Sequence, residues 1–260
     1  MTGALGLHLL QHVALVDSPR RSVLARLDDD GRLTDLVEAA GDDEVTAAAA
    51  AAEGRVLVVD APLVVPGDAG RRDVEAVLAW CDVTAFPVSR RRLVQVTGGA
   101  RGPLLAAALE RPGRLLAEGL PDLVLRQIAW ERDHPPGAPA LDLGDYRAAW
   151  IGVRAPVYRP KGTGRARPDG VRAAWDLLAG VVDLAGWRPS AAADDWSAIA
   201  DAAVIDAVCG AYAGLRVARG EGLLVGTPAR GMVAVPAGAD LRARIEATLV
   251  RLRAEGAIAV

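Results

Sequence analysis

Two short apolar runs, each ending in an aspartate, constrain this chain most. His12–Asp17 carries four apolar residues before its aspartate, and Arg55–Asp60 does the same. Such runs are typical of strands buried on both faces of a sheet, and α/β proteins place reactive groups at the carboxyl ends of these strands. If the two strands are neighbours, Asp17 and Asp60 share one cleft. Because close carboxylates raise each other's pKa unless a cation holds them, the first hypothesis is a divalent-metal site.

The segments between these two runs predict an antiparallel meander followed by a crossover. Ser22–Leu27 and Arg32–Glu38 are expected strands, and Asp28–Gly31 is a strong tight-turn signal between them. Asp42–Glu53 has the composition of a helix. The resulting β-β-β-α-β order returns Arg55–Asp60 parallel to the first strand.

The fold class that this pattern predicts is α/β, with a mixed sheet flanked by helices and interrupted by inserted loops. We expect a single domain over residues 12–260, preceded by a loose N-terminal extension, residues 1–11. The later elements are expected as a helix over Gly70–Cys81, irregular chain over residues 82–103, a strand over Arg114–Leu120, helices over Asp122–Arg132, Pro168–Leu184 and Trp196–Arg219, a hairpin from Leu223–Val225 and Gly231–Val235, and a helix over Leu241–Glu255.

Composition excludes several classes of protein. The net charge of −3 argues against a broad electrostatic footprint for nucleic acid, although it leaves room for a local basic groove. Cys81 and Cys209 have no zinc-site spacing and are expected to be buried thiols in a reducing compartment. With no signal-peptide pattern and no apolar run of about 18 residues, we expect a cytoplasmic protein without a membrane partner. Nothing in the sequence indicates an oligomeric state.

A third carboxylate belongs to the long helix expected over Trp196–Arg219. Asp201 and Asp206 are five residues apart, which is roughly 140° around a helix, so they do not share a face. Asp206 lies in the stretch of small and apolar residues that packs on a sheet. A carboxylate in a packing face is costly unless a partner pairs it, which singles out Asp206.

This ordered set of motifs resembles family 429 of the domains of unknown function, which are described as predicted nucleases of the ribonuclease H-like fold. The resemblance covers about residues 12 to 236. The family often has Gly beside its first Asp, where this chain has Leu15 and Ser18. The matching stretches are Val13–Asp17, Val58–Leu63 with Pro66, Gly70 and Arg71 after it, Leu116–Pro121 with Glu118, Lys161-Gly162, and Asp201 to Ala207.

The resemblance implies a ribonuclease H-like mixed sheet and a carboxylate cluster that binds Mg²⁺ or Mn²⁺. Asp17, Asp60 and Asp206 would be the metal ligands, with Glu118 as a fourth catalytic carboxylate. Two such ions can activate water and stabilise the leaving oxygen of a phosphodiester, so the expected substrate is DNA, RNA or a smaller phosphoester. Basic side chains expected to contact its phosphates are Lys161, Arg165, Arg71 and Arg20.

Each of these residues also has a structural interpretation. Asp17 is a good turn residue, Asp206 can bond an arginine or a backbone amide, and Lys161 can be a surface loop residue. Two further functions stay open: a non-catalytic scaffold or binding protein with this fold, and an actin-like nucleotide hydrolase, which shares the β-β-β-α-β core. Divalent-metal binding separates the scaffold from the enzymes, and ATP binding separates the hydrolase from the nuclease.

Overall fold

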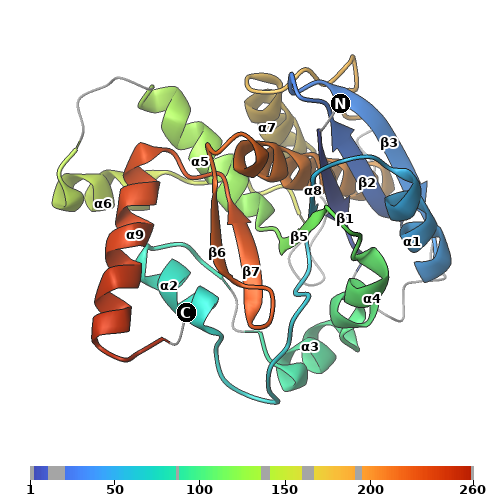
Figure 1. The fold of residues 1–260 in the computed structure, drawn as a ribbon. Helices are drawn as coiled ribbons and strands as arrows, with labels where there is room; N and C mark the ends of the chain where they lie inside the picture. Colours follow the sequence, from blue (N-terminus) through green and yellow to red (C-terminus); the bar gives the residue numbers. More distant parts are fainter. Residues whose placement is uncertain are drawn as a thin grey trace.

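The structure is a computed structural model that describes residues 3–10, 21–85, 88–135, 141–159, 167–190 and 195–258. Figure 1 shows a sheet running through the molecule with helices on both sides, so the α/β class is confirmed. In chain order the elements are β1 (Ala4–His8), β2 (Ser22–Leu27), β3 (Leu33–Ala39), α1 (Asp42–Ala51), β4 (Val56–Val59), α2 (Asp73–Trp80), α3 (Arg90–Thr97), α4 (Arg101–Leu109), β5 (Leu115–Glu118), α5 (Pro121–Asp133), α6 (Leu143–Gly152), α7 (Pro168–Ala179), α8 (Asp195–Ala218), β6 (Leu223–Thr227), β7 (Gly231–Val235) and α9 (Ala239–Ala254).

The described strands form one mixed sheet in the order β3-β2-β1-β4-β5-β7-β6. β1, β2 and β3 pair antiparallel, whereas β1, β4 and β5 run parallel. The register pairs Leu7 with Val59, and Val59 with Glu118. The carboxyl ends of β1, β4 and β5 therefore meet at one edge of the sheet, where reactive side chains gather in α/β proteins.

The sheet has little strand pairing between β5 and β7, and this boundary is called the seam. These two strands, both described in full, share one register pair, Glu118 with Val233. β6 and β7 pair along their whole length as the hairpin expected from the sequence. The sheet thus consists of the β3-β2-β1-β4-β5 part and a C-terminal hairpin, which are joined at the end of β5.

The first strand corrects the prediction from the sequence. β1 spans Ala4–His8, so the expectation of a loose extension over residues 1–11 is wrong for these five residues, four of which are fully buried. Gly6 interrupts the apolar run and weakens the strand pattern. The predicted strand His12–Asp17 lies outside the described residues.

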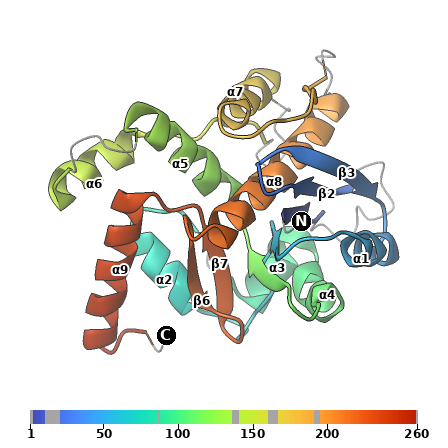
Figure 2. The same ribbon diagram turned by 45° about the horizontal axis from the view of Figure 1, so that its top comes forward.

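Gly6 is required because α8 packs directly on β1. A Cβ atom on Gly6 would lie 1.9 Å from the Ala207 carbonyl oxygen and 2.2 Å from the Ala211 amide nitrogen. Gly210 of α8 lies on the other side of this contact, and its Cβ would lie 3.1 Å from the Gly6 Cα. Figure 2 shows α8 running beside the sheet. Within Trp196–Ala218, the most apolar 18-residue window has a mean hydropathy of 1.5 and is 83% buried, so α8 is a core helix.

The opposite face of the sheet is covered by α1 and α4. Side chains alternate along the strands, so that Leu5 and Leu57 point to this face while Ala4 and Val58 point towards α8. A third apolar cluster lies around the C-terminal hairpin and joins residues of α2, α6 and α9. The protein therefore has helical layers on both faces of the sheet and a separate packed region at the hairpin.

Most of the remaining elements match the expected ones, with two corrections. Residues 82–103 are not irregular throughout, because they contain α3 and the start of α4. The sequence hid α3 because its first three residues are arginines and it buries only Leu93, which leaves no apolar periodicity to detect. α6 was not expected at all; its N-cap, Asp142, accepts hydrogen bonds from the Gly144 and Asp145 amides.

Candidate metal centre

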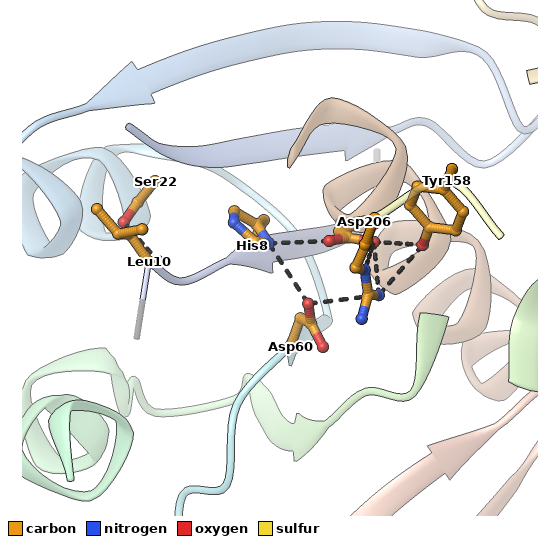
Figure 3. A network of polar contacts seen from close by, with 7 residues as sticks. His8, Leu10, Ser22, Asp60, Tyr158 and Asp206 are labelled. Carbon is orange, nitrogen blue, oxygen red and sulfur yellow. Dashed lines mark hydrogen bonds and ion pairs between the residues drawn. The ribbon is translucent and has the colours of Figure 1, made fainter. Parts of the chain in front are cut away.

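Three side chains from distant parts of the chain meet at the carboxyl edge of the sheet. His8 ends β1, Asp60 follows β4, and Asp206 lies in the middle of α8. His8 Nδ1 is 3.4 Å from Asp60 Oδ2 and 3.1 Å from Asp206 Oδ2. Figure 3 shows the imidazole in contact with both carboxylates. One ligand atom from each residue lies within 4.8 Å of the others, so a single ion can contact all three.

Arg159 and Tyr158 hold the far side of Asp206. The Tyr158 hydroxyl donates to Asp206 Oδ1 at 2.5 Å, and Arg159 Nη2 donates to the same oxygen at 2.6 Å. Arg159 Nη2 also lies 3.7 Å from Asp60 Oδ2. Because Oδ1 already accepts these bonds, Oδ2 is the Asp206 oxygen that faces His8 and Asp60.

Burial makes the charges in this cluster depend strongly on one another. The Asp206 side chain is 1% exposed, and those of Asp60 and His8 are 19% and 21% exposed. Burial alone lowers the pKa of His8, but Asp206 and Asp60 outweigh it and raise that pKa to about 9. The protonated imidazole is therefore the stable form at neutral pH.

The two carboxylates respond differently to the same environment. Burial raises the pKa of Asp60; Arg159 opposes this, and the neighbouring Asp206 adds to it. Burial also acts to raise the pKa of Asp206, but Arg159 and His8 prevail and hold it below its usual value. Asp206 is thus the carboxylate held firmly in its charged form.

The donor set of the cluster fits a divalent cation. Two carboxylates and one imidazole supply two oxygen ligands and one nitrogen ligand. Carboxylates suit Mg²⁺ and Mn²⁺, and an imidazole ligand favours the transition ion Mn²⁺ over Mg²⁺. Metal binding requires His8 to lose its proton, because only the neutral ring coordinates a metal.

Two of the predicted metal ligands come together, and one lies outside the described chain. Asp60 and Asp206 share the cluster, as the strand-end argument and the helix-face argument require. Asp17 lies outside the described residues, as do Arg20, Lys161 and Arg165. The structural interpretation of Asp206 also holds in part, since Arg159 bonds it directly.

His8 and Arg159 are the members of this cluster that the sequence argument missed. His8 follows Leu5-Gly6-Leu7, a run too short and too broken to register as a buried strand. The signal that was available is Gly6 shortly before a polar residue, since a small residue in a strand marks close approach of another backbone. Arg159 lies in irregular chain, and no local pattern connects it to Asp206.

Glu118 lies at the same sheet edge but is held by another partner. Arg72 Nη1 donates to Glu118 Oε1 at 2.6 Å, and Nη2 donates to Oε2 at 2.7 Å. Both side chains are buried, with exposures of 4% and 5%. Oε1 also accepts the amides of Leu63 and Val64 at 2.9 and 3.3 Å. Glu118 therefore anchors the loop that follows Asp60, and its role as a catalytic carboxylate remains a prediction.

The predicted phosphate contact Arg71 is next to the buried Arg72 in sequence but differs from it in environment. Arg71 is exposed, whereas Arg72 is 5% exposed and also bonds Glu75 through its Nε. Arg71 is thus a solvent-facing cation, whereas Arg72 is a structural one. The structure leaves Arg71 accessible to a ligand without placing it in the cluster.

Comparison with known proteins identifies no relative: no family model, curated protein or solved structure matches the chain. The sheet topology and the His8, Asp60 and Asp206 cluster carry the functional interpretation by themselves. Fold alone does not establish function, so the chemistry of the cluster bears most of the weight.

Proposed function

We propose that this protein is a divalent-metal-dependent phosphodiester hydrolase, a nuclease, with a ribonuclease H-like fold. The observation that carries the proposal is the convergence of the Asp60 and Asp206 carboxylates with His8 at the carboxyl edge of the sheet. The strand order β3-β2-β1-β4-β5, with an antiparallel meander before a parallel strand, supports the fold assignment. The family resemblance implied the same strand order, but with Val13–Asp17 in place of Ala4–His8 as the first strand.

In this proposal, Asp60 Oδ2, Asp206 Oδ2 and His8 Nδ1 hold the cation. When bound, the metal supplies an activated water and stabilises negative charge on the phosphate. Tyr158 and Arg159 fix the orientation of Asp206 through Oδ1, which keeps Oδ2 directed at the site. The Arg159 side chain is 36% exposed, so part of it borders the site from the solvent side.

Titration of Mn²⁺ by calorimetry tests the site. We expect wild-type protein to bind Mn²⁺, Asp60→Asn to lose binding, and Asp35→Asn to keep it. Asp35 is a suitable control because its substitution makes the same charge change on β3, where the side chain is 55% exposed. Circular dichroism establishes that each variant is folded.

Cleavage assays on the same samples test the activity, using single-stranded, duplex and hybrid substrates. Mn²⁺-dependent cleavage that disappears in Asp60→Asn supports the nuclease. Metal binding without cleavage of any substrate contradicts the nuclease and retains the metal site. ATP binding by the wild-type protein would favour the actin-like nucleotide hydrolase instead.

One observation favours a second candidate, a non-catalytic scaffold. The protonated His8 and Arg159 together balance the charges of Asp60 and Asp206, so the cluster is neutral without a metal. A structural ion-pair network of this kind needs no metal to balance its charge. This candidate predicts no Mn²⁺ binding at any pH between 6 and 9, together with a loss of stability in Asp60→Asn.

A further inference from the structure

A second polar cluster lies where α5, α6 and α9 meet the end of α2. Tyr146 and Trp150 are 1% and 0% exposed, Arg244 is 8% exposed, and Arg126 is half-buried. Within the described part of the chain, each of these four side chains has a buried polar atom without a hydrogen-bond partner. These atoms are Tyr146 Oη, Trp150 Nε1, Arg126 Nε and Arg244 Nη1.

The four side chains are direct neighbours. The Arg126 guanidinium carbon lies 4.1 Å from the centre of the Trp150 ring, and that of Arg244 lies 5.7 Å from the centre of the Tyr146 ring. The Tyr146 and Trp150 rings stack with centroids 5.9 Å apart. Both arginines also bind Asp82: Arg126 Nη1 donates to its carbonyl oxygen at 2.8 Å, and Arg244 Nη2 to its carboxylate.

The unpartnered atoms share one chemical property. The indole N–H of Trp150 and the guanidinium N–H groups of Arg126 and Arg244 can only donate, and the Tyr146 hydroxyl can donate as well. Buried polar groups are normally hydrogen-bonded, because leaving them without a partner forfeits their hydration. What this region lacks is therefore an acceptor.

Positive charge is also in excess here. Arg126 and Arg244 are accompanied by the more exposed Arg147. The Asp82 carboxylate lies within bonding distance of Arg147 and Arg244, whereas Arg126 bonds the backbone carbonyl of Asp82. Burial and the neighbouring Arg154 lower the pKa of Arg126, as expected for a cation with too little compensating charge.

We infer that Arg126, Tyr146, Trp150 and Arg244 form a binding site for a small inorganic anion. An anion accepts hydrogen bonds from several directions and donates none, which matches four donors without an acceptor. A water molecule fits less well, because it accepts about two hydrogen bonds and brings two hydrogens that need acceptors of their own. The site is separate from the proposed metal centre, since Figure 1 places α6 and α9 away from β1, which carries His8.

Thermal unfolding in chloride, inorganic phosphate and gluconate, at matched ionic strength, tests the site. We expect chloride or phosphate to raise the melting temperature of the wild-type protein above its value in gluconate. Tyr146→Phe keeps the aromatic packing, Trp150→Phe keeps one aromatic ring at the position, and each removes one donor. Both should raise the half-saturating anion concentration about tenfold, because each loses a hydrogen bond to a charged acceptor.

Tyr212→Phe is the matched control, because the Tyr212 hydroxyl is also buried but already accepts a hydrogen bond from Arg216 at 2.8 Å. Its anion dependence should equal that of the wild type. In gluconate, Tyr146→Phe should be at least as stable as the wild type, because it removes an unsatisfied hydroxyl.

Two results would overturn the inference. The first is an anion dependence that is absent, or that is unchanged in Tyr146→Phe and Trp150→Phe, which would place any bound anion elsewhere. The second is a Tyr146→Phe variant that is less stable than the wild type in gluconate and insensitive to anions, which would show that ordered water satisfies the donors. Bromide soaked into crystals gives a direct check, with an anomalous peak expected between Arg126 and Arg244.

Discussion

The buried pair between Arg72 and Glu118 provides a quantitative test of how this sheet edge is built. In Glu118→Gln, one amide oxygen can still accept from Arg72 and the Leu63 amide. The new NH₂ group, however, would face Arg72 Nη2, which donates to Oε2 at 2.7 Å in the wild type. Two donors would then oppose each other in a buried position.

The size of the effect follows from the charges left behind. Removing one partner of a buried ion pair costs about 3–5 kcal/mol. Glu118→Gln should lower the free energy of unfolding by about 3 kcal/mol, because Arg72 keeps its bond to Glu75 at 2.7 Å. Arg72→Met should lower the free energy of unfolding by about 5 kcal/mol, because it leaves both Glu118 and Glu75 without their cation. The double variant should lose less than the sum of the two single losses.

Urea unfolding followed by circular dichroism measures these free energies. The control is Glu255→Gln, which breaks an exposed pair with Arg251 in which both side chains are 51% exposed. It should cost less than about 0.5 kcal/mol. In the same samples, Glu118→Gln should bind Mn²⁺ as tightly as the wild type. A folded Glu118→Gln protein with greatly weakened Mn²⁺ binding would refute this account and make Glu118 a metal ligand.

Three further predictions follow from the packing and the cluster charges. Gly6→Ala should destabilise the protein by about 3 kcal/mol or more in thermal unfolding, because the new Cβ would lie 1.9 Å from the Ala207 carbonyl; Gly152→Ala, with nothing within 4 Å, should not. In metal-free protein, raising the pKa of His8 from 6.5 to about 9 contributes up to about 3 kcal/mol, which is fully present below pH 6.5 and is lost as the pH rises to 9. Unfolding free energies measured in chelator at pH 6 and pH 9.5 should show this loss, and His8→Gln should abolish it. Finally, calorimetry at pH 7.5 in buffers of different ionisation enthalpy should show about one proton released per Mn²⁺ bound, and the absence of release would contradict ligation by His8.

Local sequence patterns are sufficient to predict much of the fold. The apolar run before Asp60 identified β4, and the small-residue stretch around Asp206 identified the helix that packs on the sheet. Both predictions rest on burial, which leaves a periodic or continuous apolar signature in the sequence. Such a signature is absent in α3, where Leu93 is the single buried residue.

Local sequence patterns predict less of the candidate site. His8 escaped notice because the tight packing of α8 places Gly6 inside β1, so a tertiary constraint overrode strand propensity. Arg159 and Asp206 are 47 residues apart, and no local rule connects them. Glu118 was expected at the sheet edge and lies there, but its pairing with Arg72 depends on a contact across 46 residues.

The seam between β5 and β7 has a consequence for how this protein opens. One face of the β6–β7 hairpin packs with α2, α6 and α9, and the other, with Met232 and Ala234, joins the core around α8. Its only strand pairing to the rest of the described sheet is Glu118 with Val233. Arg72, at the start of α2, forms an ion pair with Glu118 at the end of β5 and so connects the hairpin region to the rest of the sheet. Segments joined to a sheet by little strand pairing tend to open as separate cooperative units. Amide hydrogens of the hairpin and α9 should therefore exchange together through a sub-global opening, while those of β1 and β4 exchange only when the whole chain unfolds.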